Sequence, residues 1–273
     1  MIGPISKIIF AQGISPLETA FWRGTLAGAA FFIHWLFKRY ELPRNPRQFI
    51  GIVLFGIFGV ALLEGSYVYA VHFGGAALAS VLLYSAPVWV NLASLLIFKE
   101  TIPQKRWVAL SITMLGVLGV CLWGAKATFS GPAIMWGLLS GLSYAAFYLA
   151  GKIYFHRTNP VVVYMIAFPV GSFAIWPIMS YLSDMTMIES VTHITRFPPA
   201  TLGAFLALGI VCTYLPYWLY SKGLKVVETG RAAIITMVEP VVSVSLAALI
   251  FGELFTTAGY CFAALVILGV AIS

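Results

Sequence analysis

Charged residues are scarce in this sequence, and their scarcity excludes a water-soluble fold. Only 9% of the 273 residues are Asp, Glu, Lys or Arg, whereas 61% are hydrophobic. A soluble domain carries about a quarter charged residues, so these few cannot cover a water-exposed surface. The apolar stretches instead exceed the roughly 18 residues that mark a membrane-spanning helix. Such helices satisfy their own backbone hydrogen bonds inside a bilayer.

Clustered cysteines and the common catalytic motifs are also lacking. Cys121, Cys212 and Cys261 lie inside apolar stretches and show neither disulfide nor metal-ligand spacing. The four histidines are scattered, and the sequence holds no P-loop, HExxH or GxSxG motif. These absences exclude an ATP-driven pump for this chain alone. We expect no enzymatic activity, no cofactor and no metal.

Proline, glycine and charge clusters divide the chain into ten apolar segments that predict helices. They cover residues 1–12, 17–37, 48–72, 75–98, 105–124, 131–153, 160–182, 199–222, 230–251 and 257–273. The first segment rises only about 18 Å, which is too short for a hydrocarbon core of about 30 Å. We therefore expect an all-α membrane protein of ten transmembrane helices, with the first helix truncated in this chain.

One segment recurs 153 residues further along the chain. Residues 87–100 read PVWVNLASLLIFKE and residues 240–253 read PVVSVSLAALIFGE, with six of fourteen positions identical. The same offset relates Gly56 to Gly209, Tyr67 to Tyr220, Ala79 to Ala232, and Gly116 to Gly269. The recurrence predicts two repeats of five helices each.

The loop charges predict how these repeats cross the membrane. Twelve of the sixteen basic residues follow even-numbered helices and two follow odd-numbered ones, which places the even loops and both termini in the cytoplasm. Because five is odd, the second repeat is inverted, and Gly252 replaces Lys99 on the opposite side. We expect inverted repeats over residues 1–124 and 125–273, the architecture of a secondary transporter with its site near the midplane.

The motifs LLYSAPVWVNLASLLIFKE and MVEPVVSVSLAALIFGE, followed by GVLGV and LVILGVAI, resemble the paired EamA-type repeats of the drug/metabolite transporter superfamily. SPLETAFWRGTLAGAAFF resembles the second helix of that family, including its arginine at Arg23. The resemblance covers essentially the whole chain. It implies a ten-helix bundle with a central cavity, and export of amino acids or other metabolites, or carriage of sugars, nucleotide sugars or choline.

Charges inside apolar segments are the strongest functional pointers, because each is costly in a membrane unless it is paired or solvated. Glu239 precedes Pro240, and it either bonds neighbouring helices around a kink or contacts substrate or a proton. Glu64 has Tyr217 as its repeat counterpart, and it serves either the cavity or an ion pair with Arg23. We expect both carboxylates to point into the bundle.

Polar and aromatic side chains at helical spacing complete the predicted site, although each of them could equally serve packing. Rings with polar tips suit a cavity for a partly apolar or cationic organic molecule. The expected cavity residues are Glu64, Tyr67, Ser80, Tyr84, Asn91, Ser140, Tyr144, Tyr148, Tyr214, Tyr217, Thr236, Glu239 and Ser243, with helix kinks at Pro87 and Pro240.

Together these features predict a secondary transporter that moves an amino-acid-like or amine-like metabolite by alternating access, in the direction of export. A carrier of sugars or nucleotides is the alternative within the family. A membrane-embedded enzyme, a channel or a scaffold is the alternative from another class. The expected partners are the substrate and the bilayer, with proton coupling left open. We expect no nucleic acid, a monomer or weak homodimer, and a multi-pass protein of the inner membrane.

Overall fold

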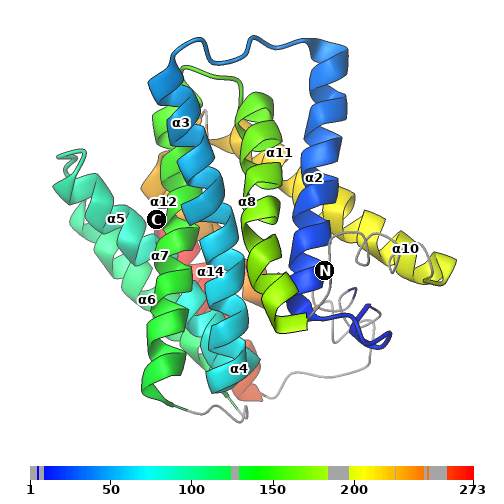
Figure 1. The fold of residues 1–273 in the computed structure, drawn as a ribbon. Helices are drawn as coiled ribbons and strands as arrows, with labels where there is room; N and C mark the ends of the chain where they lie inside the picture. Colours follow the sequence, from blue (N-terminus) through cyan, green and yellow to red (C-terminus); the bar gives the residue numbers. More distant parts are fainter. Residues whose placement is uncertain are drawn as a thin grey trace. The chain divides into compact units, whose positions relative to one another are not determined.

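The computed structural model describes residues 5, 9–123, 129–183, 197–224, 226–242, 245 and 257–273. Its regular structure is helical, and no strand occurs among these residues (Figure 1). The chain forms two compact units, Met1–Gly65 with Ala150–Gly223, and Ser66–Leu149 with Leu224–Ser273. Each unit therefore combines segments that lie far apart in the sequence.

The first unit is built from two runs of helices. Its helices are α2 (Pro16–Lys38), α3 (Pro46–Phe55), the π-helix η1 (Gly56–Ala61), the start of α4 (Leu62–Leu83), the end of α7 (Gly131–Tyr154), α8 (Pro160–Ser183), α10 (Pro199–Leu206), the π-helix η2 (Ala207–Tyr214) and α11 (Leu215–Gly223). α2 packs against both α8 and η2, and α8 also packs against η1. Helices from the first 65 residues and from residues 150–223 thus form one core.

The second unit likewise pairs early helices with late ones. It holds the rest of α4 and α7, together with α5 (Ala86–Leu96), α6 (Gln104–Leu122), α12 (Thr229–Thr236) and α14 (Thr257–Ile272). α6 packs along α14, and α12 packs against α5 and α6. Ile234 and Met237 are fully buried in the core shared by these helices, beside Val266 of α14.

Six of the described helical stretches are long and apolar enough to cross a membrane. They are Pro46–Gly75, Ala77–Leu96, Gln104–Leu122, Gly131–Tyr154, Pro160–Tyr181 and Pro199–Gly223. The described residues thus have the helical structure and the apolar spans expected of a multi-pass membrane protein. The predicted helix over residues 1–12 and the end of the one over residues 230–251 fall largely outside the described residues.

Helix breaks occur at equivalent positions of the two predicted repeats. Residues 84–85 form a turn between α4 and α5, and residues 237–238 form a turn after α12. These turns are 153 residues apart, and each is followed closely by a proline, Pro87 or Pro240. Proline lacks a backbone N–H and its ring clashes with the preceding turn, so it begins a helix more readily than it continues one.

The two π-helices also occupy equivalent positions, and each has a glycine against a helix of the other chain segment. Gly56 of η1 faces α8, where an added Cβ would lie 2.7 Å from the carbonyl oxygen of Ala167. Gly209 of η2 faces α2, where an added Cβ would lie 2.5 Å from the Cβ of Leu26. Only glycine allows such close approach of the two backbones.

Substitution of these glycines by alanine is expected to destabilise the protein. Gly56→Ala and Gly209→Ala should each lower the free energy of unfolding by about 1–3 kcal/mol, the usual cost of overpacking. Gly203→Ala in α10 is the matched control, because no atom lies within 4 Å of its added Cβ, and it should raise stability by up to about 1 kcal/mol. Unfolding by sodium dodecyl sulfate in mixed micelles measures all three. Equal effects at the three positions would contradict the close packing.

Candidate functional site

Two pairs of hydroxyl groups meet within the second unit. The hydroxyls of Tyr148 and Thr236 lie 2.5 Å apart, and those of Tyr67 and Ser80 lie 3.1 Å apart. Tyr67 and Ser80 are separated by 13 residues of α4, which in a straight helix would place them about 20 Å apart. Gly75 brings them together, because its φ of 82° and ψ of 160° interrupt the helix in a region that favours glycine.

A carboxylate follows one of these hydroxyl pairs at a helix break. Glu239 begins the helical residues that follow the turn after α12, three residues after Thr236, the hydrogen-bond partner of Tyr148. The ring of Tyr144 lies 5.2 Å from that of Tyr148. We name the group comprising Tyr67, Ser80, Tyr84, Tyr144, Tyr148, Thr236 and Glu239 the hydroxyl–carboxyl cluster.

Burial varies across the hydroxyl–carboxyl cluster in a way that suits binding. Tyr148 is only 2% exposed, whereas Glu239 is exposed and Tyr84 is half-buried. Thr236, the hydrogen-bond partner of Tyr148, is itself held in place because its hydroxyl donates a hydrogen bond to the carbonyl oxygen of Ala233 at 2.9 Å. An accessible carboxylate can hold a cation through its charge, and a fixed aromatic ring can hold one through its π-face.

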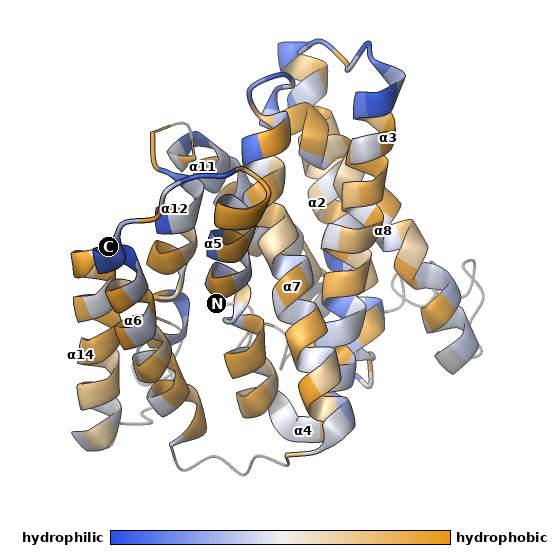
Figure 2. Ribbon diagram, turned by 90° about the vertical axis from the view of Figure 1, so that its left-hand side faces the viewer, coloured by the Kyte–Doolittle hydropathy of each residue, from blue (hydrophilic) through white to orange (hydrophobic). Residues whose placement is uncertain are grey.

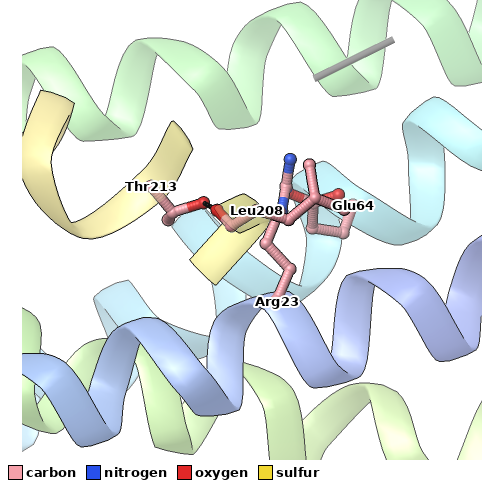
Figure 3. Close-up of polar contacts among 4 residues, drawn as sticks. All are labelled: Arg23, Glu64, Leu208 and Thr213. Carbon is pink, nitrogen blue, oxygen red and sulfur yellow. Dashed lines mark hydrogen bonds and ion pairs between the residues drawn. The ribbon is translucent and has the colours of Figure 1, made fainter. Parts of the chain in front are cut away.

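The first unit holds a separate pair of charges. Arg23 reaches from α2 to form an ion pair with Glu64 of α4, and both side chains are 19% exposed. Thr213 and Leu208 of η2 lie beside the pair, and the Thr213 hydroxyl donates to the Leu208 carbonyl at 2.8 Å (Figure 3). Pairing lowers the cost of placing both charges in an apolar segment.

The two tyrosines predicted on residues 199–222 also lie in the first unit. The Tyr214 hydroxyl is 2.8 Å from Nδ1 of His34. The ring of Tyr217 packs 5.6 Å from that of Tyr164 and 5.3 Å from that of Phe168. Both side chains thus interact within the first unit, and neither belongs to the hydroxyl–carboxyl cluster.

Two other predicted residues bond to their own helices. The Asn91 side-chain amide donates to the carbonyl oxygen of Pro87 at 2.8 Å, and the Ser140 hydroxyl donates to that of Gly137 at 2.7 Å. Both side chains are buried in the second unit. Ser243 lies outside the described residues.

Sequence reasoning did not predict an ion pair between Arg106, near the start of α6, and Glu228, just before α12. The Arg106 side chain is 13% exposed, and Gly230 leaves room for it because an added Cβ there would lie 3.4 Å from Nη1. The pair spans 122 residues, and no local pattern signals such a contact. Among the described residues, no group of three or more His, Cys, Asp and Glu could hold a metal ion.

Apolar helices of spanning length, with polar and charged groups at their breaks, define a multi-pass membrane protein. The chain belongs to the EamA-like transporter family, whose model matches residues 1–122 and 131–273. The resemblance drawn from the sequence motifs is therefore confirmed.

Curated relatives agree with this membership, and a solved structure shares the fold. A transporter of Archaeoglobus fulgidus is 28% identical over 100% of this chain and 92% of its own length. A protein of Salmonella typhimurium described as a probable amino-acid metabolite efflux pump is 26% identical over 79% of this chain and 74% of its own length. A crystal structure with a TM-score of 0.76 and 18% identity covers 99% of this chain and 92% of that one, and so shares the fold. The relatives are named as transporters, which confirms the expected class of protein.

Proposed function

We propose that this transporter exports a small metabolite carrying a cationic amino group, either an amino acid or an amine. The observation that carries the proposal is the position of Glu239, three residues after Thr236, whose hydroxyl lies 2.5 Å from that of Tyr148. A carboxylate pairs strongly with an ammonium group, and tyrosine rings attract the same cation through their faces. The Salmonella typhimurium relative, described as a probable amino-acid metabolite efflux pump, supports both the substrate class and the direction.

The proposed mechanism is alternating access between two inverted five-helix repeats, residues 1–124 and 125–273. The helix breaks and π-helices at equivalent positions support the repeat, as does the twofold match of the family model. In such transporters, discontinuous helices supply the groups that bind substrate and coupling ions. Proton coupling at Glu239 belongs to this proposal, because a carboxylate can release a cation when it takes up a proton.

The proposed orientation places both termini in the cytoplasm of a cell with an inner membrane. It is supported by the excess of Lys and Arg in the loops after even-numbered helices. The proposed state is a monomer or weak homodimer. A reporter fused after Lys105 or Arg157 tests the orientation, since both positions should be cytoplasmic.

Flux measurements across proteoliposome membranes test the proposed function. The full chain should exchange labelled amino acids or amines across the membrane, and at a given concentration each transported compound should inhibit the exchange of the others. Sugars and nucleosides serve as controls of similar size without the cationic amino group, and they should give only the background leak. Flux of a sugar or nucleoside without flux of any amino compound would favour the alternative carrier, and chemical turnover of the probe would indicate an enzyme.

A further inference from the structure

One end of the first unit carries an open pocket of about 440 Å³. The connection between α2 and α3 forms one wall, with Leu42, Arg44 and Asn45, and the residues before α8 form the other, with Arg157 and Asn159. This pocket lies wholly within one unit and contains none of the residues of the hydroxyl–carboxyl cluster. It therefore requires its own explanation.

Two hydrogen-bonded helix starts hold the pocket walls in place. The side-chain oxygens of Asn45 and Asn159 accept hydrogen bonds from the second residue beyond each of them, at 2.9 and 3.0 Å. The side-chain amide of Gln48 in α3 donates to the hydroxyl of Thr158 at 2.5 Å and so joins the two walls. Both helices direct the positive ends of their dipoles toward the pocket.

The side chains of the pocket add a net positive charge. Arg44 and Arg157 are both exposed, and Glu41 is the acidic residue of the lining, 3.3 Å from Arg44. Within the part of the chain that the structure describes, Arg157 has no carboxylate within 4.0 Å. An arginine in this state offers its planar set of donors to an incoming anion, and phosphate matches that geometry.

Apolar side chains flank the pocket on the side of the helices. Leu42 in the lining is exposed, as are Phe49 and Ile50 of α3, which follow Gln48 directly. Figure 2 shows a hydrophilic connection between α2 and α3 above a mainly hydrophobic α3. In a membrane protein, such exposed apolar side chains face the acyl chains of lipids.

We propose that this pocket binds the phosphate of an anionic membrane phospholipid, with the acyl chains lying along α3. A free phosphate offers the same group to the arginines. The lipid is the better occupant because the apolar side chains beside the pocket match the rest of that molecule. This proposal does not depend on the transported substrate.

Binding of phosphatidylglycerol to the full chain in micelles tests the proposal, with native mass spectrometry counting the bound lipids. Wild-type protein should retain phosphatidylglycerol in preference to phosphatidylcholine. Arg44→Gln/Arg157→Gln should weaken this retention roughly tenfold or more, the effect of losing hydrogen bonds to a charged group. Lys99→Gln/Lys105→Gln removes the same charge from another loop and should leave retention unchanged.

Two further arms make the outcome decisive. Inorganic phosphate should not raise the unfolding temperature of protein in phosphatidylcholine, and it should not displace phosphatidylglycerol from protein that has bound this lipid. If phosphate alone raises the unfolding temperature and displaces the lipid, the assignment to a phospholipid is wrong. If the arginine and lysine variants retain phosphatidylglycerol equally, this pocket is not the binding site of the lipid. Both arginines are exposed, so the variants should fold, and the single variant Arg157→Gln provides a milder test with the same expected direction.

Discussion

Replacing Glu64 with glutamine is expected to destabilise the protein by about 3 kcal/mol, because removal of one partner of a largely buried ion pair leaves the other charge uncompensated. The remaining partner is Arg23, whose side chain is 19% exposed. Arginine cannot be deprotonated in proteins, so its guanidinium would stay charged among apolar helices. That charge is expensive in a membrane unless it is paired or solvated.

The opposite substitution should cost less, and the double substitution should recover stability. In Arg23→Gln the remaining Glu64 can take up a proton and become neutral, which limits the loss. In Arg23→Gln/Glu64→Gln neither charge remains, and two amides can share a hydrogen bond. The coupling energy from the complete double-mutant cycle should be about 1–3 kcal/mol.

An exposed ion pair of the same unit supplies the control for this cycle. Glu41 lies 3.3 Å from Arg44, and both side chains are more than four-fifths exposed, so Glu41→Gln should change stability by less than about 1 kcal/mol. Unfolding by sodium dodecyl sulfate in micelles of the full chain measures every variant. If Glu64→Gln is as mild as Glu41→Gln, the Arg23–Glu64 pair does not stabilise the fold.

The second large effect is expected at Glu239, on transport rather than on stability. Loss of a hydrogen bond to a charged group removes about 1.5–3 kcal/mol of binding, so Glu239→Gln should weaken the apparent affinity for an amino compound roughly ten- to hundredfold. Glu239 is exposed, and glutamine keeps the shape of its side chain. The variant should therefore unfold at the same detergent concentration as the wild-type protein.

The dependence of the exchange rate on pH is a second measurement that tests the Glu239→Gln variant. A carboxylate titrates and an amide does not, so Glu239→Gln should flatten the pH profile of exchange if the proposed proton coupling acts there. Glu41→Gln is the matched surface control and should retain both the rate and the pH profile. Wild-type exchange by Glu239→Gln at every pH would leave Glu239 as a structural residue and would remove the main support for a cationic substrate.

The positions of the helices could be predicted from the sequence because local chemistry determines where they begin and end. Pro16, Pro46, Pro160 and Pro199 each open a helix at or within two residues of its predicted start, as expected for a residue that lacks a backbone N–H. The ion pair of Arg23 with Glu64 was also within reach, since it is one of the two roles that the sequence predicted for Glu64. Neither inference required knowledge of distant contacts.

The arrangement of the site could not be predicted in the same way. The contact of Tyr67 with Ser80 depends on the left-handed backbone of Gly75, and the sequence does not show which glycine of a membrane helix takes that conformation. The contact of Arg106 with Glu228 depends on how α6 packs against α12. Such contacts follow from tertiary packing, which residue spacing along one helix does not determine.

The π-helix η1 changes the rotational register of the residues that follow it in the same helix, as far as Gly75. A π-helix bonds each residue to the fifth one along rather than the fourth, so a helical wheel drawn from Pro46 with 3.6 residues per turn assigns Glu64 to the wrong face. One residue corresponds to about 100° of rotation. The π-helix absorbs about the rotation of one residue, so a single-residue deletion within Gly56–Ala61 that leaves an uninterrupted α-helix would keep the Glu64 carboxylate turned toward α2. A relative whose corresponding segment is a plain α-helix should therefore align with one residue fewer there, and an ungapped alignment to it would assign the wrong side chains to the face toward α2.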